Sequence, residues 1–246
     1  MTLFNHIGKY FMLMRSAMRR PEKWGLLLRM TIQEIDKIGI QSVGIVSLLA
    51  LFMGAVICLQ TAAQIDSGWI PLYTIGFTVR QTMILEFAPT MIPVIMAGKV
   101  GSNISSEIGT MRISEQIDAL DIMGVNSAGY LILPKIIGAV VIFPFLIIGG
   151  MFLGIAAGAM IGEIGGVISF ADYEVGIQYD FRPFQVAYAL IKTTVFAFII
   201  VTVSAYTGYY TRGGALEVGR ASTQAVVYSI VLIMITNLVL TELLLT

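Results

Sequence analysis

Charge is scarce in this sequence. Only 12% of the 246 residues are Asp, Glu, Lys or Arg, whereas 57% are hydrophobic and the mean hydropathy is +0.86. Soluble domains carry about 25% charged residues, so the deficit indicates that most of the chain lies in lipid. The 15 basic and 15 acidic residues cancel, and this balance gives no indication of nucleic acid as a partner.

Several kinds of chemical site are also missing. The single Cys58 excludes an intrachain disulfide and a Cys-based metal site, and the single His6 excludes a His-cluster metal site. The sequence contains no phosphate-binding GxxxxGKS or GxxxxGKT loop, no GxSxG and no HExxH. We therefore expect no catalytic residue, no metal site and no cofactor in this chain.

Long apolar runs fill much of the sequence. A membrane-spanning helix needs about 20 predominantly apolar residues. Four charge-free runs of this kind are present, at 38–65, 136–162, 193–211 and 221–241. A fifth stretch, 73–98, is hydrophobic but contains Arg80, Glu86, Pro89 and Pro93. We expect a broken span there, second in chain order, because each proline removes a backbone donor and clashes with the preceding turn.

The basic residues near the span ends predict an orientation. With five spans, twelve Lys and Arg residues fall on one side: seven in 1–40, three in 97–135 and two in 209–222. The other side keeps only Arg182, while Arg80 and Lys192 lie within or at the edge of spans. The positive-inside rule then places the N-terminus in the cytoplasm and the C-terminus outside.

The first 38 residues predict a region ahead of the spans. One apolar stripe at helical spacing is formed by Phe4, Ile7, Phe11, Met14 and Met18. Pro21 is expected to end this helix, and the pattern resumes at Trp24. An interfacial helix on the inner leaflet is the favoured interpretation, and a cytoplasmic segment packed on protein is the alternative. The long charged N-terminus is not that of a cleavable signal, and the absence of a transit segment after Met1 favours a bacterial protein.

Five glycines recur at four-residue spacing at 150, 154, 158, 162 and 166. Small residues at this spacing let helix backbones approach closely in membranes. The row winds around its helix, so it is expected to serve more than one neighbour. Packing within the chain is favoured over a homodimer seam.

Two charges at membrane depth predict an internal cavity. Glu86 and Lys192 have opposite signs, and charges in this environment are costly unless they are paired. We expect the two side chains to flank one cavity and to pair across it, with a transport role or a purely structural one. The other residues expected to line a lipid cavity are Gln60, Gln64, Pro89 and Asn237.

The polar stretch 98–124 is expected to carry a short cytoplasmic helix between the second and third spans. Ser114 is predicted to cap this helix and Gly124 to stop it. An acidic stripe (Glu115, Asp118, Asp121) runs beside an apolar one (Ile117, Leu120, Met123). Such a helix either docks another protein or packs on the chain's own cytoplasmic surface.

Three segments resemble one family. The stretch AGKVGSNISSEIGTMRISEQIDALDIMG (97–124) closely resembles the signature of the MlaE permeases of bacterial ABC lipid transporters, which work with MCE-domain proteins. TRGGALEVGRASTQAVVYS (211–229) and LEFAP (85–89) are similar to further motifs of that family. The resemblance implies an all-α integral membrane protein with an N-terminal interfacial helix (1–38) and a five-span permease domain (39–246). It also implies a coupling segment at about 99–126.

The same resemblance implies a function. The chain would be the homodimeric permease subunit of an ABC transporter in the bacterial inner membrane, moving phospholipid to or from a periplasmic MCE protein and maintaining outer-membrane lipid asymmetry. A separate ATPase subunit would bind ATP and Mg²⁺. The residues implied in coupling to that subunit are Glu115, Gln116, Asp118, Leu120, Asp121, Lys99, Glu107, Arg212 and Arg220.

Two other functions are compatible with the residues alone. A proton-coupled secondary transporter would use Glu86 and Lys192, but the paired broken helices typical of such folds are not evident. A membrane scaffold that only anchors partners is the second alternative. The charged, proline-containing span argues against it, because a scaffold does not require such a costly segment. Dependence of transport on ATP rather than on a proton gradient separates the first alternative from a permease.

Overall fold

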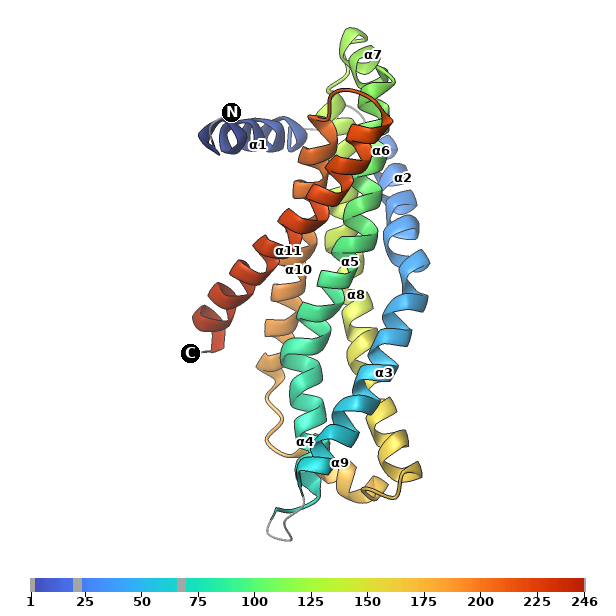
Figure 1. The fold of residues 1–246 in the computed structure, drawn as a ribbon, viewed down its shortest axis with the longest axis vertical. Coiled ribbons are helices and arrows are strands. Elements are labelled where there is room, and N and C mark those ends of the chain that lie inside the picture. The colour runs from blue at the N-terminus through green and yellow to red at the C-terminus, as the bar shows by residue number, and fades with distance from the viewer. Residues whose placement is uncertain (1–2, 20–23, 66–69, 246) are drawn as a thin grey trace. The chain divides into compact units, whose positions relative to one another are not determined.

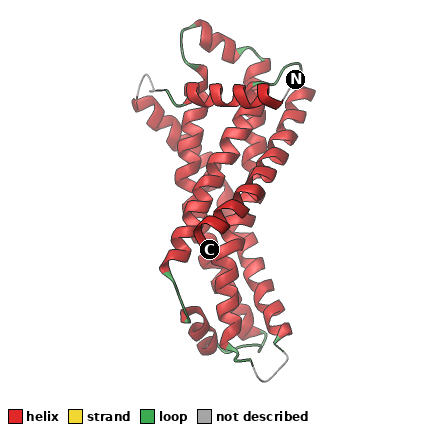
Figure 2. Cartoon of the chain, turned by 90° about the vertical axis from the view of Figure 1, so that its left-hand side faces the viewer, coloured by secondary structure: helices red, strands yellow, loops and turns green. Residues whose placement is uncertain are grey.

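The computed structural model describes residues 3–19, 24–65 and 70–245. Pro21, expected to end the N-terminal helix, lies outside this part of the chain, as do Asp66, Arg20 and Lys23. All regular secondary structure in the described residues is helical (Figure 2). The predicted all-α class is confirmed.

Figure 1 labels the α-helices among the helical elements of the described residues. They are α1 (Leu3–Ala17), α2 (Trp24–Ile35), η1 (Asp36–Ile40), α3 (Gln41–Gln64), α4 (Tyr73–Thr82), η2 (Met83–Met91), α5 (Ile92–Met96), η3 (Ala97–Gly101), α6 (Ser102–Ile113), α7 (Gln116–Ile122), α8 (Ser127–Ile164), α9 (Phe170–Gln178), α10 (Pro183–Tyr209) and α11 (Ala215–Leu245). The η elements are π-helical segments inside longer helices.

Five continuous helices are long and apolar enough to cross a membrane, which confirms the predicted number. They are Trp24–Gln64, Tyr73–Ile113, Ser127–Ile164, Pro183–Tyr209 and Ala215–Leu244. The first two contain 41 residues each, or about 61 Å at 1.5 Å per residue, against a hydrocarbon core of about 30 Å. Both helices therefore extend beyond the hydrocarbon core of a bilayer, and the predicted boundary between residues 38 and 39 falls inside the first of them.

The second spanning helix is continuous, so the expectation of a broken span was wrong. Pro89 lies inside the π-helical segment η2, where the backbone N–H of Ile92 donates to the carbonyl of Phe87, five residues earlier. The wider π-turn gives the proline ring room beside the preceding turn. The helix then passes Pro93 and runs through η3 and α6 to Ile113.

The chain forms two compact units. Unit 1 consists of residues 1–41, 94–142 and 194–246, and unit 2 of residues 42–93 and 143–193. The long helices α3, α8 and α10 contribute residues to both units.

Small residues bring α6 close to α10 in unit 1. A Cβ on Gly208 would lie 2.6 Å from the carbonyl oxygen of Ser105, and the Ser105 and Thr207 hydroxyl oxygens are 3.1 Å apart. The helix α1 is attached to α10 as well, because the Tyr10 hydroxyl donates to Thr202 Oγ1 at 2.9 Å. Unit 1 thus joins the N-terminal helix to the spans through polar contacts.

The exposed side of α1 agrees with an interfacial helix. Phe4 is 84% exposed, and Ile7, Phe11 and Met18 are exposed too, whereas Met14 is buried. Most of the predicted apolar stripe is therefore not covered by the described part of the chain. This exposure favours a lipid-facing helix over a segment packed on protein.

The glycine row of α8 packs inside unit 2, in agreement with the favoured interpretation. A Cβ on Gly54 of α3 would lie 1.9 Å from the carbonyl oxygen of Gly154. A Cβ on Gly158 would meet the Tyr173 hydroxyl of α9 at 2.5 Å, and one on Gly150 would meet Ile92 at 2.8 Å. The row serves three neighbouring elements, and these close approaches leave no room for larger side chains.

The short helix α9 was not predicted. Its N-terminus is capped by Ser169, whose hydroxyl oxygen accepts the backbone N–H of Asp172 at 3.1 Å. This Ser-x-x-Asp pattern is a recognisable start signal. Burial raises the pKa of the Tyr173 phenol, so this group stays protonated and donates to the carbonyl of Ile155 on α8 at 3.0 Å.

Candidate functional site

The turn between α6 and α7 presents an acidic and apolar surface. Glu115, Asp118 and Asp121 are exposed on it. Next to them, Ile122 is 87% exposed and Met123 is 68% exposed. Ile117 is fully buried and anchors the helix. Exposed large apolar side chains beside carboxylates at the end of a helix are typical of a surface that binds another protein.

The two ends of α7 form differently. The C-terminal end of α7 agrees with the prediction. Gly124 has φ +79°, its N–H donates to the backbone carbonyl of Asp121, and the Val125 N–H donates to the backbone carbonyl of Leu120. Together these bonds form a Schellman motif. The predicted cap at its start was wrong. Ser114 ends α6 instead, because its hydroxyl donates to the carbonyl of Thr110 at 2.7 Å.

Glu115 makes the turn between α6 and α7. Its φ is +60°, a left-handed conformation that is uncommon for residues other than glycine. Gln116, the first residue of α7, is exposed, and its amide donates to the Ser114 hydroxyl at 3.1 Å. Leu120 is half-buried.

Arg112 fixes α7 to the rest of unit 1. Its Nη1 donates to Asp118 Oδ1 at 2.6 Å, and its guanidinium carbon lies 5.7 Å from the centre of the Tyr209 ring on α10. The Tyr209 hydroxyl is 2.9 Å from the hydroxyl of Ser127, the first residue of α8. A chain of contacts therefore runs from α7 to the ends of two spanning helices.

The structure brings together the two motifs read from the sequence, 97–124 and 211–229. The Ser222 hydroxyl on α11 donates to the carbonyl of Ser102 on α6 at 3.2 Å, and a Cβ on Gly109 would lie 3.2 Å from Val218. Arg212 is exposed, and Arg220 donates to Glu217 at 2.7 Å on the exposed side of α11.

Lys99 and Glu107, two of the residues implied in coupling, lie on the second spanning helix, in η3 and α6. The Lys99 ammonium donates to the carbonyl of Gln41. Glu107 pairs with the buried Lys135 of α8 at 2.7 Å, and Lys135 also donates to Glu34 of α2 at 2.9 Å. Sequence reasoning missed this cluster. The available signal was Lys135, which adjoins the apolar run 136–162. A charge at such a position is costly to bury unless it is paired, so a carboxylate partner is expected.

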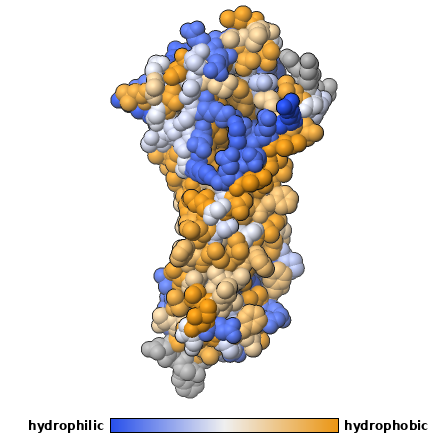
Figure 3. Space-filling model, turned by 90° about the vertical axis from the view of Figure 1, so that its right-hand side faces the viewer, coloured by the Kyte–Doolittle hydropathy of each residue, from blue (hydrophilic) through white to orange (hydrophobic). Residues whose placement is uncertain are grey.

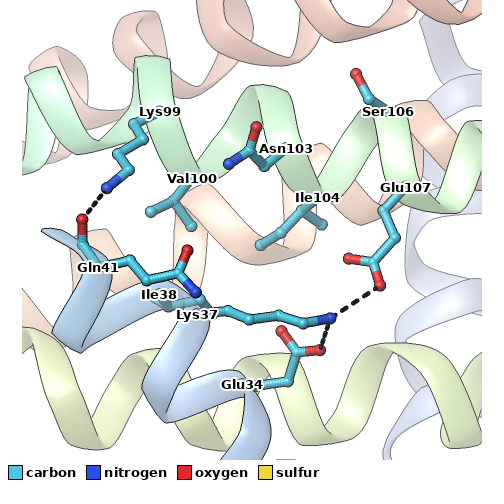
Figure 4. Close-up of a pocket in the computed structure, with 10 residues that line it drawn as sticks. All are labelled: Glu34, Lys37, Ile38, Gln41, Lys99, Val100, Asn103, Ile104, Ser106 and Glu107. Carbon is cyan, nitrogen blue, oxygen red and sulfur yellow. Dashed lines mark hydrogen bonds and ion pairs between the residues drawn. The ribbon is translucent and has the colours of Figure 1, made fainter.

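Glu34, Gln41, Lys99 and Glu107 help to line a pocket of about 360 Å³ in unit 1 (Figure 4). The pocket lies between α2 with η1 on one side and η3 with α6 on the other. Its lining mixes charged, amide and aliphatic side chains.

The expected pair between Glu86 and Lys192 is present in unit 2. Lys192 Nζ lies 3.1 Å from Glu86 Oε1, and it also donates to the carbonyl of Leu85 and the hydroxyl of Tyr188, each at 3.2 Å. The other Glu86 oxygen accepts the Thr90 hydroxyl at 2.9 Å. A fully buried ammonium thus has a charged partner and two neutral acceptors.

The other residues expected around a lipid cavity are dispersed. Gln60 and Gln64 are exposed on α3, and Pro89 is buried in η2, all in unit 2. Asn237 is half-buried on α11 and belongs to unit 1.

Arg80 is a buried cation to which the sequence assigned no role. Its Nη1 donates to the carbonyls of Ile177 and Tyr179, at 2.7 and 2.9 Å, and so satisfies the C-terminal end of α9. Its guanidinium also lies 5.1 Å from the centre of the Phe77 ring. Arg80 therefore holds α9 on the second spanning helix.

Comparison with known proteins shows which family this chain is similar to. The family model described as "Permease MlaE" matches residues 31–243. A "Probable ABC transporter permease protein" of Rickettsia bellii is 35% identical over 241 residues, which are 98% of this chain and 93% of that protein. A permease of the same description from Rickettsia prowazekii is 37% identical over 218 residues, 89% of this chain and 84% of that protein.

A plant protein is similar as well. "Protein TRIGALACTOSYLDIACYLGLYCEROL 1, chloroplastic" of Arabidopsis thaliana is 32% identical over 214 residues, which are 87% of this chain and 61% of that protein. The five spans, the two joined motifs and the match over most of the chain lead to one assignment. The chain belongs to the MlaE family of ABC transporter permeases, and a permease subunit is not itself an enzyme.

Proposed function

We propose that this permease moves phospholipid between the bacterial inner membrane and a periplasmic MCE-domain protein, and that this transport maintains outer-membrane lipid asymmetry. The observation that supports a lipid cargo most directly is the similarity to a plant protein whose name contains that of a galactolipid. Removing a lipid from a bilayer exposes acyl chains at about 0.8 kcal/mol per CH₂. The transport therefore needs an external source of free energy.

A separate ATPase subunit binds ATP and Mg²⁺, supplies that free energy by hydrolysing the ATP, and docks on α7. Two features support this docking: the exposed pair Ile122 and Met123, and the carboxylates of Glu115 and Asp121 beside them. The contacts of Arg112 with Asp118 and Tyr209 connect the docked helix to α10. Motion of the ATPase thus reaches the spans through unit 1.

The arrangement in the membrane follows from charge and from family membership. The N-terminus and α7 face the cytoplasm, the C-terminus and α9 face the periplasm, and two copies of the chain enclose the lipid cavity. Twelve basic residues on one side support this orientation. Glu86, Lys192, Gln60, Gln64, Pro89 and Asn237 are the residues proposed to border the cavity.

Docking is tested by co-purification of the ATPase subunit with the permease. Replacing Ile122 and Met123 by Asp should release the ATPase while the permease keeps its elution volume and thermal stability. Ile164→Asp is the matched control, since Ile164 is 78% exposed at the last residue of α8, on the proposed periplasmic side. Retention of the ATPase by the doubly substituted, folded permease would contradict docking on α7.

The energy source separates this function from a proton-coupled transporter. In liposomes containing the complex, lipid transfer should need ATP and should be indifferent to an imposed proton gradient. Transfer by the permease alone, driven by the gradient, would instead support the alternative that uses Glu86 and Lys192.

A further inference from the structure

The pocket of unit 1 has an apolar floor and a polar rim. Ile38, Val100 and Ile104 are buried at its base, whereas the side chains of Lys37 and Asn103 are exposed at its edge (Figure 4). On the face of the molecule seen in Figure 3, hydrophilic residues surround a hollow. A volume of about 360 Å³ is within the range of small-molecule sites.

The charges around this pocket do not cancel. The pocket is lined by two lysines and two carboxylates (Lys37, Lys99, Glu34 and Glu107), and both carboxylates also pair with the buried Lys135, which does not line the pocket. These five groups together carry a net charge of +1. The buried Lys135 takes the short contacts, at 2.9 and 2.7 Å. The half-exposed Lys37 lies 3.9 and 3.6 Å from the same carboxylates, beyond hydrogen-bond distance. Its ammonium therefore retains donors for an added anion.

The pocket lies at the level where two spanning helices leave the apolar part of the membrane. Lys37 is the last charge before the charge-free run 38–65, and Lys99 is the first after the charge-free segment 87–98. Both π-helical segments of unit 1, η1 and η3, contribute lining residues, and such segments frequently occur at functional sites. Lipid headgroups occupy this level of a bilayer.

We infer that this pocket binds the phosphate group of an anionic phospholipid, as a site separate from the cavity of the transported lipid. Lys37, Lys99 and the Asn103 amide donate to the phosphate oxygens, because charge-assisted hydrogen bonds to phosphate are strong. Basic pockets between spanning helices on the cytoplasmic side are known to hold anionic headgroups. The apolar floor contacts the first carbons of the lipid. A bound lipid bridges the first two spanning helices.

The test measures retention of phosphatidylglycerol by the purified permease complex, using native mass spectrometry. The double variant Lys37→Gln, Lys99→Gln should retain it at least about tenfold less, because both charge-assisted hydrogen bonds to the phosphate are lost. Asn103→Asp keeps both lysines, and hence the Lys99 contact with Gln41, but places a carboxylate beside the phosphate. It should also reduce retention.

The matched control is Arg29→Gln, which removes an exposed cation from α2 outside the pocket. It should retain phosphatidylglycerol as the unaltered chain does. Equal retention by the folded double variant or by Asn103→Asp would overturn the inference. Inorganic phosphate is the second probe: displacement of the lipid by millimolar phosphate would assign the pocket to a soluble anion instead.

Discussion

The ammonium of Lys192 lies 3.1 Å from the carboxylate of Glu86, yet the two side chains differ in burial. The lysine side chain is 0% exposed and that of the glutamate is 49% exposed. Removing the glutamate leaves a buried charge with only neutral acceptors, whereas removing the lysine leaves a carboxylate that is half free of protein contact. The pair is therefore asymmetric in its effect on stability.

Glu86→Gln should destabilise the permease more than Lys192→Met. Breaking a buried pair by removing one partner costs about 3–5 kcal/mol when the remaining charge stays buried. Thermal unfolding in detergent measures the difference. The exchange Glu86→Lys, Lys192→Glu should recover part of the stability lost in either single reversal. If the exchange is no better than the single reversals, the pair does not stabilise the fold through its charges.

Arg80→Leu should loosen α9 from the second spanning helix. Arg80 is 1% exposed, and its loss leaves the carbonyls of Ile177 and Tyr179 without this donor, at about 1–3 kcal/mol for each group that stays buried. Hydrogen exchange over 170–179 should become faster. Arg80→Lys should give an intermediate rate, because an ammonium lacks the planar guanidinium fork. Glu174→Gln, an exposed change on the same helix, is the control, and equal protection in all variants would contradict this role.

Arg112→Gln should weaken ATPase binding with little loss of fold stability. The Arg112–Asp118 pair is partly exposed, and such pairs contribute about 0.2–1 kcal/mol. Because the loss of this pair releases α7 from α10, the affinity for the ATPase should fall several-fold. Titration of the detergent-solubilised permease with the ATPase measures this affinity. Arg182→Gln breaks the exposed pair with Asp180 and should leave this affinity unchanged. An unaltered affinity in Arg112→Gln would show that α7 binds without this support.

Gly54→Ala should destabilise unit 2, because its Cβ would lie 1.9 Å from the carbonyl oxygen of Gly154. Overpacking of this kind costs about 1–3 kcal/mol or more. Gly149→Ala is the matched control on α8, where a Cβ meets nothing within 4 Å. It should be neutral or stabilising by up to about 1 kcal/mol in thermal unfolding, since alanine favours the helix. A neutral Gly54→Ala would contradict the close approach of α3 and α8 at this glycine.

The spans were predictable because their signal is local. Charge-free runs such as 38–65 and 136–162 are recognised from composition alone, and Gly124 stops α7 as its type predicts. The glycine row also indicated close packing, although the partners on α3 and α9 came only from the structure.

The errors arose where one residue type has two uses. Ser114 fits the start of a helix by pattern, but α6 reaches Ile113, so its hydroxyl bonds backwards to Thr110. Pro89 predicted a break, yet a π-turn accommodates it. The cluster around Lys135 joins residues about 100 and 28 positions away. Lys135 itself indicated that a carboxylate partner is needed, but a single sequence does not show which distant residue it is.

The order of charges along the chain has a consequence for biogenesis. In unit 1, Glu34 and Glu107 are synthesised before Lys135, and in unit 2, Glu86 is synthesised before Lys192. Each lysine can therefore pair with its carboxylates only after they are already part of the ribosome-bound, partly inserted polypeptide. The early spans thus acquire these charged neighbours only after translation has entered the third span in one unit and the fourth in the other.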